Sequence, residues 1–518
     1  MEVINDVALK LQLRHPQKVL SVIPDSKLIE QHEDGRGVVI VRWGVEQAQV
    51  LKNLNIKNVP SPISRKYAWP GSRTPFAHQI QTSSFLTLHR RAFVFNDAGT
   101  GKSASVIWAA DYLMSKKIIN RVLVICPMSV MQAAWMGDLF QTAMHRSADI
   151  AHGSREKRKQ VIRGDAEFVI INFDGVKIMS KEIAQAGFDL VVIDEANYVK
   201  NANTDRWKAI NGLIRPSTWL WMLTGTPASQ SPTDAFGLAK MMNPTSVPRS
   251  FNLFRDQVMT KISLYKWTPK SDAIHRVNQI LQPAIRFTKD ECLDLPDIIY
   301  TTRDVPLSSQ QKKLYDQLRK SMVANCAGET VSAVNAAVGL QKLAQASAGA
   351  VFTDNDKVIE LDIAPRYNVL TEVLDEAPEK VLVFAAYTHV LDQLHEKLTG
   401  DGYTVEMIRG DVSATRRAKV IDDFQNKSDP RVLLIQPQAA SHGVTLHAAS
   451  TIVWWGPVFS YETYVQANAR IHRAGQTKKC RVVRLQGSPV ERLRFAHLDK
   501  AEDTNESLLK MFKEVLTM

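Results

Sequence analysis

Apolar runs of four or five residues recur along this chain, and segments with helical spacing of apolar positions separate them. This alternation is typical of βαβ units, because a strand buried on both faces of a parallel sheet is apolar throughout. One set of predicted strands begins at Ala92, Val122, Phe168, Leu190 and Trp219. A second set begins at Val381, Val405, Val432, Ile452 and Val482. The pattern therefore predicts two α/β lobes.

The segments outside these two sets predict helices and one small separate unit. Residues 38–41 read as a strand and residues 46–54 as a short helix, and a proline-rich linker over residues 60–75 follows. Between the two strand sets the chain is mostly helical. Ser308 with Gln311 forms a capping-box pattern at one helix start there.

We therefore expect an α/β protein with three parts, which a chain of 518 residues can accommodate. Residues 1–70 form a small N-terminal α+β domain. Residues 71–290 form a first parallel-sheet lobe with a helical insertion, and residues 291–518 form a helical insertion and a second lobe. The stretch from residue 490 to residue 518 predicts a C-terminal helix.

Composition and charge narrow the class of protein. Apolar residues make up 45% and charged residues 23%, as in ordinary globular proteins, and no apolar run approaches the ~18 residues of a membrane span. The four cysteines show no C-x-x-C pair, and the start of the chain lacks the pattern of a signal peptide. We expect a reducing intracellular compartment. The formal net charge of +12 favours a polyanionic partner such as nucleic acid, although solubility alone also explains it.

Two motifs follow apolar strands of the first lobe, where open α/β sheets bind ligands. The glycine-rich stretch Asp97–Ser103 follows the run Ala92–Phe95, and Asp194-Glu195 follows Leu190–Ile193. A glycine-rich turn lets backbone N–H groups approach phosphate oxygens, and a lysine adds a positive charge beside them. A hydroxyl and a carboxylate hold magnesium. The pattern indicates a site for ATP and magnesium, although Asn96 stands where the strict motif has glycine.

Each residue of these motifs has an expected role. The loop residues that cradle phosphates are Gly99, Thr100, Gly101, Lys102 and Ser103. We expect Lys102 to reach the β and γ phosphates, Ser103 and Asp194 to hold magnesium, and Glu195 to deprotonate the attacking water. Asp194 and Glu195 alternatively cap a helix. Gln79, upstream of the loop, is expected to select adenine, and a plain surface glutamine is the alternative.

Two basic segments are candidates for phosphate contacts. The segment Gln466–Gln476 lies in the second lobe and includes Arg470 and Arg473, which are three residues apart and would share one helix face. These guanidinium groups suit a γ-phosphate from another lobe, with Gln466 in the same catalytic set. A solvated basic turn is the alternative. The cluster over residues 155–159 is either a phosphate-facing patch or one solvated helix face.

These residues carry a resemblance to the Swi/Snf-type ATPase family of helicase superfamily two. Asp194–Asn201 resembles its D-E-A-H-R-x-K-N element, Leu223–Pro227 resembles its third motif, and Val124–Pro127 with Trp135 is similar to its C-P-x-S-x-x-x-x-W stretch. Residues 470–476 match R-x-H-R-x-G-Q, the most family-specific signal. The resemblance runs from about residue 74 to 495 and leaves residues 1–70 outside.

The resemblance implies two RecA-like lobes with ATP between Lys102 and Arg473. It also implies ATP-driven translocation along double-stranded DNA. The DNA contacts that it implies are Pro127, Thr226, Arg409 and Gly443. Three positions depart from the family pattern. Asn96 replaces a common aspartate or glycine, Asn197 replaces the usual histidine of the acidic motif, and Pro437 stands where the fifth motif has a hydroxyl residue.

We expect a compact bacterial or phage-like member that acts as a monomer on duplex DNA, forked or branched duplexes included, in replication, recombination or repair. Such a protein is cytoplasmic, or nuclear in a eukaryote. One alternative is a helicase that separates strands or migrates branches, which needs a pin element to split the duplex. Another is an ATP-gated clamp that binds nucleic acid without translocation.

Overall fold

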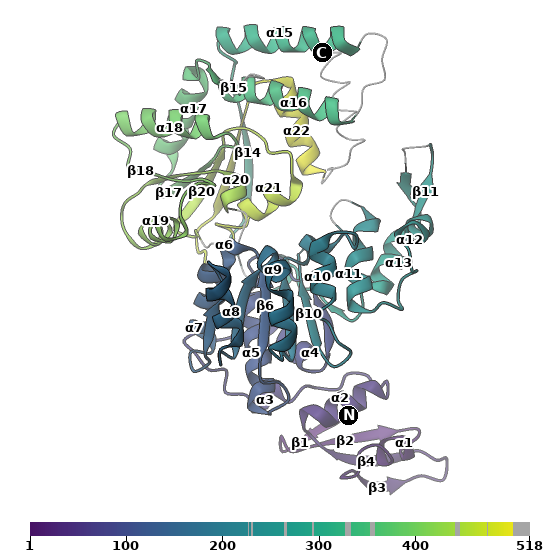
Figure 1. Ribbon diagram of the computed structural model, residues 1–518. Coiled ribbons are helices and arrows are strands. Elements are labelled where there is room, and N and C mark those ends of the chain that lie inside the picture. The colour runs from purple at the N-terminus through teal and green to yellow at the C-terminus, as the bar shows by residue number, and fades with distance from the viewer. Residues whose placement is uncertain are drawn as a thin grey trace. The chain divides into compact units, whose positions relative to one another are not determined.

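The chain separates into two compact units, Met1–Cys292 and Leu293–Met518. The computed structural model describes residues 1–225, 227–228, 231–263, 267–292, 295–326, 333–352, 358–440, 446–473 and 475–500. Each unit contains one parallel sheet with helices packed against it (Figure 1). The α/β class with two parallel-sheet lobes is therefore confirmed.

A small antiparallel sheet with the strand order β1-β2-β4-β3 begins the first unit. Its elements are β1 (Glu2–Ile4), β2 (Ala8–Leu13), α1 (Gln17–Leu20), β3 (Lys27–Gln31), β4 (Gly37–Arg42) and α2 (Val45–Asn53). Leu9, Val39 and Leu51 lie in its own buried core. The expected strand over residues 38–41 and helix over residues 46–54 are confirmed as β4 and α2, so this part is an α+β structure.

The large sheet of the first unit is parallel and has the order β13-β5-β10-β9-β6-β8-β7. Its strands are β5 (Arg91–Val94), β6 (Val122–Cys126), β7 (Ala148–Ile150), β8 (Phe168–Asn172), β9 (Leu190–Asp194), β10 (Trp219–Leu223) and β13 (Ala284–Ile285). The helices around it are α3 (Ile63–Lys66), α4 (Ala77–Thr87), α5 (Lys102–Ser115), α6 (Met128–Val130), α7 (Gly137–Thr142), α8 (Arg155–Arg163), α9 (Phe173–Gln185), α10 (Asp205–Asn211) and α11 (Ala235–Met242).

The remaining elements of this unit are short. They are a π-helical turn (Met131–Met136), 3₁₀ turns (Ala196–Val199 and Pro232–Asp234), the hairpin β11 (Met259–Lys261) and β12 (Trp267–Pro269), and the helices α12 (Phe251–Val258), α13 (Ala273–Ile280) and α14 (Lys289–Cys292). All five strands predicted for this lobe are confirmed. The sequence pattern missed β7 and β13, because runs of two or three residues leave no measurable periodicity.

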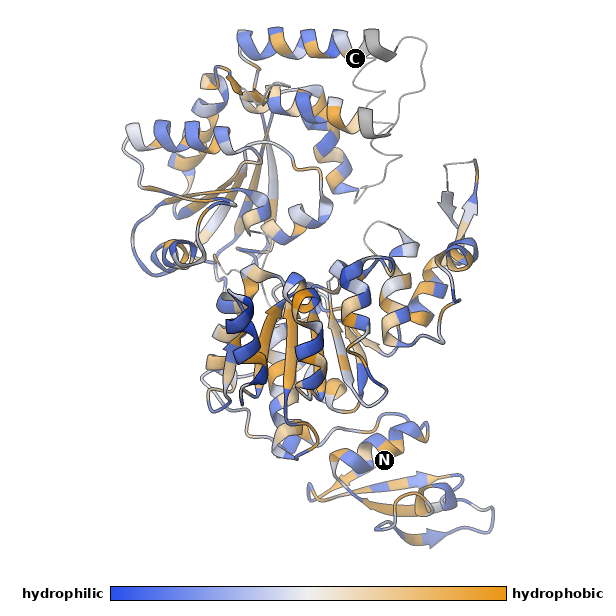
Figure 2. Ribbon diagram, viewed as in Figure 1, coloured by the Kyte–Doolittle hydropathy of each residue, from blue (hydrophilic) through white to orange (hydrophobic). Residues whose placement is uncertain are grey.

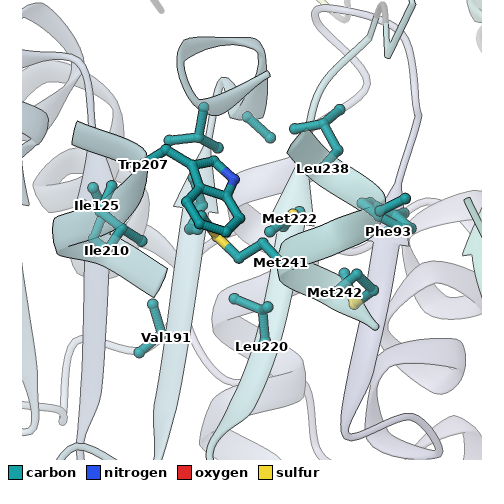
Figure 3. Packing of buried hydrophobic residues seen from close by; sticks show 14 of the residues in the cluster. Phe93, Ile125, Val191, Trp207, Ile210, Leu220, Met222, Leu238, Met241 and Met242 are labelled. Carbon is teal, nitrogen blue, oxygen red and sulfur yellow. The ribbon is translucent and has the colours of Figure 1, made fainter. Parts of the chain in front are cut away.

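Two hydrophobic clusters cover the two faces of this sheet. Neighbouring residues of one strand divide between them: Leu220 and Met222 belong to one cluster, and Trp219 and Trp221 to the other. Figure 3 shows the first cluster, where Trp207 and Met241 pack over Met222 from the helices α10 and α11. Burial on both faces explains why the strands are apolar throughout.

Hydrogen bonds connect the N-terminal α+β part to the linker, and both of them to the end of α4. The Trp43 indole donates to the carbonyl of Pro60 at 2.8 Å, and the Gln49 amide of α2 donates to the carbonyl of Thr87 at the end of α4 at 2.7 Å. The hydroxyls of Ser61 and Thr87 share a hydrogen bond of 2.6 Å. The linker and α2 therefore meet the C-terminal end of α4.

The second unit is built on a parallel sheet with the order β14-β21-β20-β17-β19-β18. Its strands are β14 (Ile298–Asp304), β17 (Lys380–Phe384), β18 (Val405–Ile408), β19 (Val432–Ile435), β20 (Ala449–Trp454) and β21 (Cys480–Gln486), with the small hairpin β15 (Ala350–Phe352) and β16 (Val358–Glu360). Its helices are α15 (Ser309–Cys326), α16 (Ala333–Ala348), α17 (Ala364–Glu376), α18 (Thr388–Gly400), α19 (Ala414–Asn426), α20 (Pro437–Ala440), α21 (Tyr461–Asn468) and α22 (Pro489–Asp499).

The five strands predicted for the second lobe are confirmed, and β14 was missed. β14 lies at the edge of the sheet, where exposed and half-buried positions replace a continuous apolar run. The capping box is also confirmed, because the Gln311 side chain accepts from the Ser308 N–H at 3.0 Å and the Gln311 N–H donates to the Ser308 hydroxyl at 3.2 Å. The expected C-terminal helix is observed as α22, and its continuation beyond Lys500 lies outside the described residues.

Hydropathy follows this architecture. The strands of the parallel sheets are largely orange in Figure 2, while α8 with its basic residues is blue. Within the described ranges, no helix combines the length and the apolar character that crossing a bilayer requires.

Candidate nucleotide-binding site

The glycine-rich loop connects the end of β5 to the first residue of α5. Gly99 and Gly101 adopt left-handed backbone conformations, with φ of 89° and 78°. The positive φ of Gly101 favours glycine, and a Cβ atom there would lie 2.1 Å from the Gln79 amide nitrogen, so the Gln79 side chain would have to move. Lys102 and Ser103 follow in the first turn of α5.

The side chain of Lys102 bends back over this loop. Its ammonium group donates to the carbonyl oxygens of Asn96 at 2.9 Å and Asp97 at 3.2 Å. The Thr100 hydroxyl donates to the same Asp97 carbonyl at 2.9 Å. The loop thus places a positive charge beside the N-terminus of α5, the end of a helix that favours anions.

Two buried side chains of α4 contact the backbone of the loop. The Gln79 amide donates to the Thr100 carbonyl at 3.1 Å, and the His78 ring nitrogen Nε2 lies 2.8 Å from the same oxygen. The Gln79 carbonyl accepts from the N–H of Phe76 at 3.0 Å. Gln79 is therefore beside the loop, as expected for a nucleotide site, with its amide bonded to backbone groups; its selection of adenine stays a prediction.

Asn96, the departure from the strict glycine motif, has a structural role. Its buried amide donates to the Thr82 hydroxyl of α4 at 3.0 Å and accepts from the N–H of Phe287 at 3.0 Å. A glycine at this position could make neither contact. The asparagine therefore connects the loop to α4 and to the segment after β13, and sequence patterns gave no signal for this.

The acidic motif lies at the same edge of the sheet as the loop. Leu223 of β10 is paired with Val94 of β5 on one side and with Asp194 of β9 on the other. Two strand spacings therefore separate Val94 from Asp194, or about 10 Å. The loop after β5 and the carboxylate at the end of β9 are thus neighbours across one strand.

The carboxylate of Asp194 is held by two N–H groups. The Trp135 indole donates to Oδ2 at 2.9 Å, and the backbone N–H of Glu195 donates to Oδ1 at 3.0 Å. Burial raises the pKa of Asp194 above its ordinary value, while the positive charge of Lys102 and the Trp135 hydrogen bond oppose that rise.

Glu195 has an uncommon backbone conformation for a residue other than glycine. Its φ of 52° and ψ of 58° lie in the left-handed region, which costs an L-residue about 1–2 kcal/mol. Residues held in such conformations cluster at active sites. The conformation is compatible with the expected catalytic role.

The third motif packs directly against the glycine-rich loop. The N–H of Thr224 donates to the Val94 carbonyl at 3.1 Å, and a Cβ atom at Gly225 would lie 3.6 Å from the Asn96 carbonyl. The next residue, Thr226, lies outside the described residues. Pro127 follows β6 at the same edge of the sheet, and its DNA contact stays a prediction.

The structure fits a magnesium ion at this site. The hydroxyl of Ser103 and the carboxylate of Asp194 are hard oxygen donors, which magnesium prefers, and phosphate oxygens and water complete its octahedral shell in such sites. No cluster of three or more histidine, cysteine, aspartate or glutamate side chains with metal-ligating geometry occurs in the parts of the chain that the structure describes. A dedicated all-protein metal cage is therefore not found there.

The basic motif of the second unit differs from its expected geometry. Helix α21 ends at Asn468, so Arg470 and Arg473 lie beyond the helix and the expectation that they share one helix face is wrong. The N–H of Leu446 donates to the Arg470 carbonyl at 3.0 Å, which ties the chain to the segment before β20. Spacing alone does not reveal where a helix ends.

Within this motif, the side chains are arranged by local contacts. The Arg470 guanidinium is buried and donates to the Gln466 carbonyl at 2.9 Å, and the Gln466 amide donates to Glu462 at 3.2 Å. Burial, together with the positive charge of Arg473, lowers the pKa of His447 below its ordinary value. The catalytic roles of Gln466, Arg470 and Arg473 stay predictions.

The remaining DNA-contact candidates lie in the second unit. Arg409, just after β18, forms ion pairs with Asp392 at 2.7 Å and Asp411 at 2.8 Å. Gly443 lies outside the described residues, and Pro437 begins helix α20, a position that proline tolerates. None of these observations tests a contact with DNA.

Comparison with known families agrees with the site. The SNF2-related domain matches residues 41–348, and the helicase conserved C-terminal domain matches residues 365–475. The first match begins inside β4, earlier than the expected start of the resemblance near residue 74. The matched ranges include the loop after β5, the acidic motif and the basic motif after α21 as far as Gly475.

Several known proteins are similar to this chain. An uncharacterised ATP-dependent helicase of Mycoplasma genitalium is 27% identical over 402 residues, which cover 75% of this chain and 37% of that protein. The SWI/SNF-related matrix-associated actin-dependent regulator of chromatin subfamily A-like protein 1 of Xenopus laevis is 26% identical over 404 residues, 76% of this chain and 39% of that protein. The chain thus spans less than half the length of these two relatives. A Sulfolobus solfataricus SWI2/SNF2 ATPase core, solved in complex with double-stranded DNA, is 20% identical, with coverage of 87% of this chain and 95% of that chain and a TM-score of 0.42.

Proposed function

This chain belongs to the SNF2-related family of helicase-like ATPases, and on that premise we propose that it hydrolyses ATP to translocate along double-stranded DNA. The observation that supports the chemistry most directly is the pairing of three neighbouring strand ends. Leu223 of β10 pairs with Val94 of β5 on one side and with Asp194 of β9 on the other. The glycine-rich loop after β5 and the acidic pair at the end of β9 therefore lie on the two sides of the end of β10. We further propose that this translocation serves DNA replication, recombination or repair.

The residues of the first unit divide the ATPase chemistry among them. Backbone N–H groups of Gly99 to Gly101 and the Lys102 ammonium bind the phosphates. Ser103 and Asp194 hold magnesium, which neutralises phosphate charge when bound. Glu195 orients the attacking water and accepts its proton. Gln79 holds the loop and contributes to adenine selection.

The second unit supplies the remaining positive charge in this proposal. Arg470 and Arg473 stabilise the charge on the transferred phosphoryl group, with Gln466 in the same set. In this proposal the two arginines reach the nucleotide only when the two units close. Hydrolysis is therefore coupled to the movement of one unit relative to the other. DNA contacts the chain through phosphates, with Pro127, Thr226, Arg409 and Gly443 as candidates.

A triplex-displacement assay tests translocation directly. A third DNA strand is bound in the major groove of a duplex, and its release by the protein is followed with ATP and with a non-hydrolysable analogue. We expect release that requires hydrolysis, without separation of a plain duplex in a parallel strand-displacement assay. Strand separation in the second assay would favour a helicase, and tight ATP-gated binding without release in either assay would favour a clamp.

A further inference from the structure

The indole of Trp135 contacts the acidic motif but has no role among the expected motif functions. Its side chain is fully buried, and its only polar atom, the Nε1–H group, donates to Asp194 Oδ2 at 2.9 Å. Indole N–H is a donor only. The geometry therefore directs it at one specific oxygen of the carboxylate.

This contact determines the orientation of the carboxylate. The other oxygen, Oδ1, accepts from the backbone N–H of Glu195 at 3.0 Å, so each carboxylate oxygen has one N–H donor. Each oxygen retains a second lone pair for a further partner. The two donors come from different segments, the residue just after β9 and the turn after α6, and together they favour one orientation of the carboxylate.

The local backbone explains how tryptophan reaches this position. β6 pairs with β9 in the sheet, with Ile125 opposite Ile193, so the chain leaves β6 next to Asp194. It then passes through α6 into the π-helical turn Met131–Met136, which contains Trp135. Single π-helical turns occur frequently at functional sites. The wider turn is a second observation that sets this segment apart from an ordinary helix.

We propose that Trp135 is a positioning residue, whose indole N–H holds the Asp194 carboxylate in the orientation that binds magnesium with the nucleotide. This inference rests on the proposed ATPase function. Partners that orient metal ligands typically contribute 10- to 100-fold to metal affinity. Trp135 also packs in the core with Leu139 and Cys126, so its test must separate the hydrogen bond from packing.

The test compares Trp135→Phe with Trp221→Phe. Both changes remove an indole N–H from the same buried cluster and keep an aromatic ring, but the Trp221 indole donates to the carbonyl of His89 at 3.0 Å. Binding of a fluorescent ATP analogue is measured as magnesium is titrated, and again in excess EDTA. Thermal unfolding verifies that each variant is folded.

We expect Trp135→Phe to raise the magnesium concentration for half-maximal binding about tenfold or more, with nucleotide affinity in EDTA changed less than about twofold. Trp221→Phe should leave both values near wild type. Equal losses with and without magnesium, an unchanged magnesium requirement, or the same shift in Trp221→Phe would overturn the proposal. An Asp194→Asn background should abolish the effect of Trp135→Phe, because Trp135 acts through that carboxylate.

Two further comparisons keep the outcome decisive. If Trp135→Phe does not fold, a benzothienylalanine at position 135 keeps the size of the ring system and lacks only the N–H donor; the same magnesium shift is expected. The wild-type titration tests the proposed function separately. Wild-type protein that binds the nucleotide independently of magnesium would contradict the proposed ATPase site, whatever the Trp135 variants show.

Discussion

At the scale of single residues, the conformation of the loop after β5 is stabilised by side chains from other parts of the first unit. Gly101 leaves room for the Gln79 amide, and Asn96 joins the loop to Thr82 and Phe287. The glycines and Lys102 were predictable, because their motif has a fixed spacing. The partners of Asn96 were not, because they come from segments far apart in the sequence.

We predict that Asn96→Ala destabilises the protein by about 1–3 kcal/mol, because it removes a buried amide that bonds to Thr82 and leaves the half-buried N–H of Phe287 without its acceptor. Asn426→Ala is the matched control, since it removes the same type of side chain from an exposed site, where its amide donates to Asp422 at 2.7 Å. Chemical denaturation of both variants measures the difference. Equal stability of Asn96→Ala and wild type would show that the amide contacts do not hold the loop.

We also predict that Lys102→Ala and Glu195→Gln abolish ATP turnover while DNA binding is largely retained. The first removes the phosphate-binding charge and the second removes the base. Lys116→Ala, at the other end of α5, serves as the control. Turnover assays and DNA-binding titrations check this, and normal hydrolysis in either site variant would refute the assignment.

At the scale of elements, the central strands of both sheets and the edge strand β18 were predictable, whereas β7, β13 and β14 were not. Buried parallel strands such as β6 and β9 are apolar throughout, whereas β7 and β13 are too short and β14 is half exposed. The π-helical turn at Trp135 and the end of α21 before Arg470 also had no sequence signal. Both depend on tertiary contacts, which override local periodicity.

One buried ion pair holds three elements of the second unit together. Arg366 of α17 donates two hydrogen bonds to Glu491 of α22, at 2.6 and 2.8 Å, and one to the carbonyl of Trp455 after β20 at 2.6 Å. Both charged side chains are about 1–2% exposed. Removal of one partner leaves an uncompensated charge in the core.

We predict that Glu491→Gln lowers the free energy of unfolding by about 3–5 kcal/mol, the usual effect of breaking a buried pair. Glu376→Gln removes the exposed partner of Arg303 and Arg481 and should change it by about 1 kcal/mol or less. Denaturant unfolding of both variants gives the comparison. Similar effects of the two substitutions would contradict the structural role of the buried pair.

At the scale of the whole molecule, each unit carries one part of the motif set. The first unit holds the glycine-rich loop and the acidic pair, and the second holds the arginines after α21. The net charge of +12 is compatible with a nucleic-acid partner. In our proposal the nucleotide joins the two units, so a single arginine of the second unit should control hydrolysis in the first.

The most direct test of this account is the rate of ATP turnover by the full chain, with and without duplex DNA, for wild type and Arg473→Ala. We predict that duplex DNA stimulates the wild-type rate and that Arg473→Ala lowers the stimulated rate about 10³-fold, as loss of an arginine finger does. A folded wild-type protein whose turnover is the same with and without any nucleic acid would contradict the account.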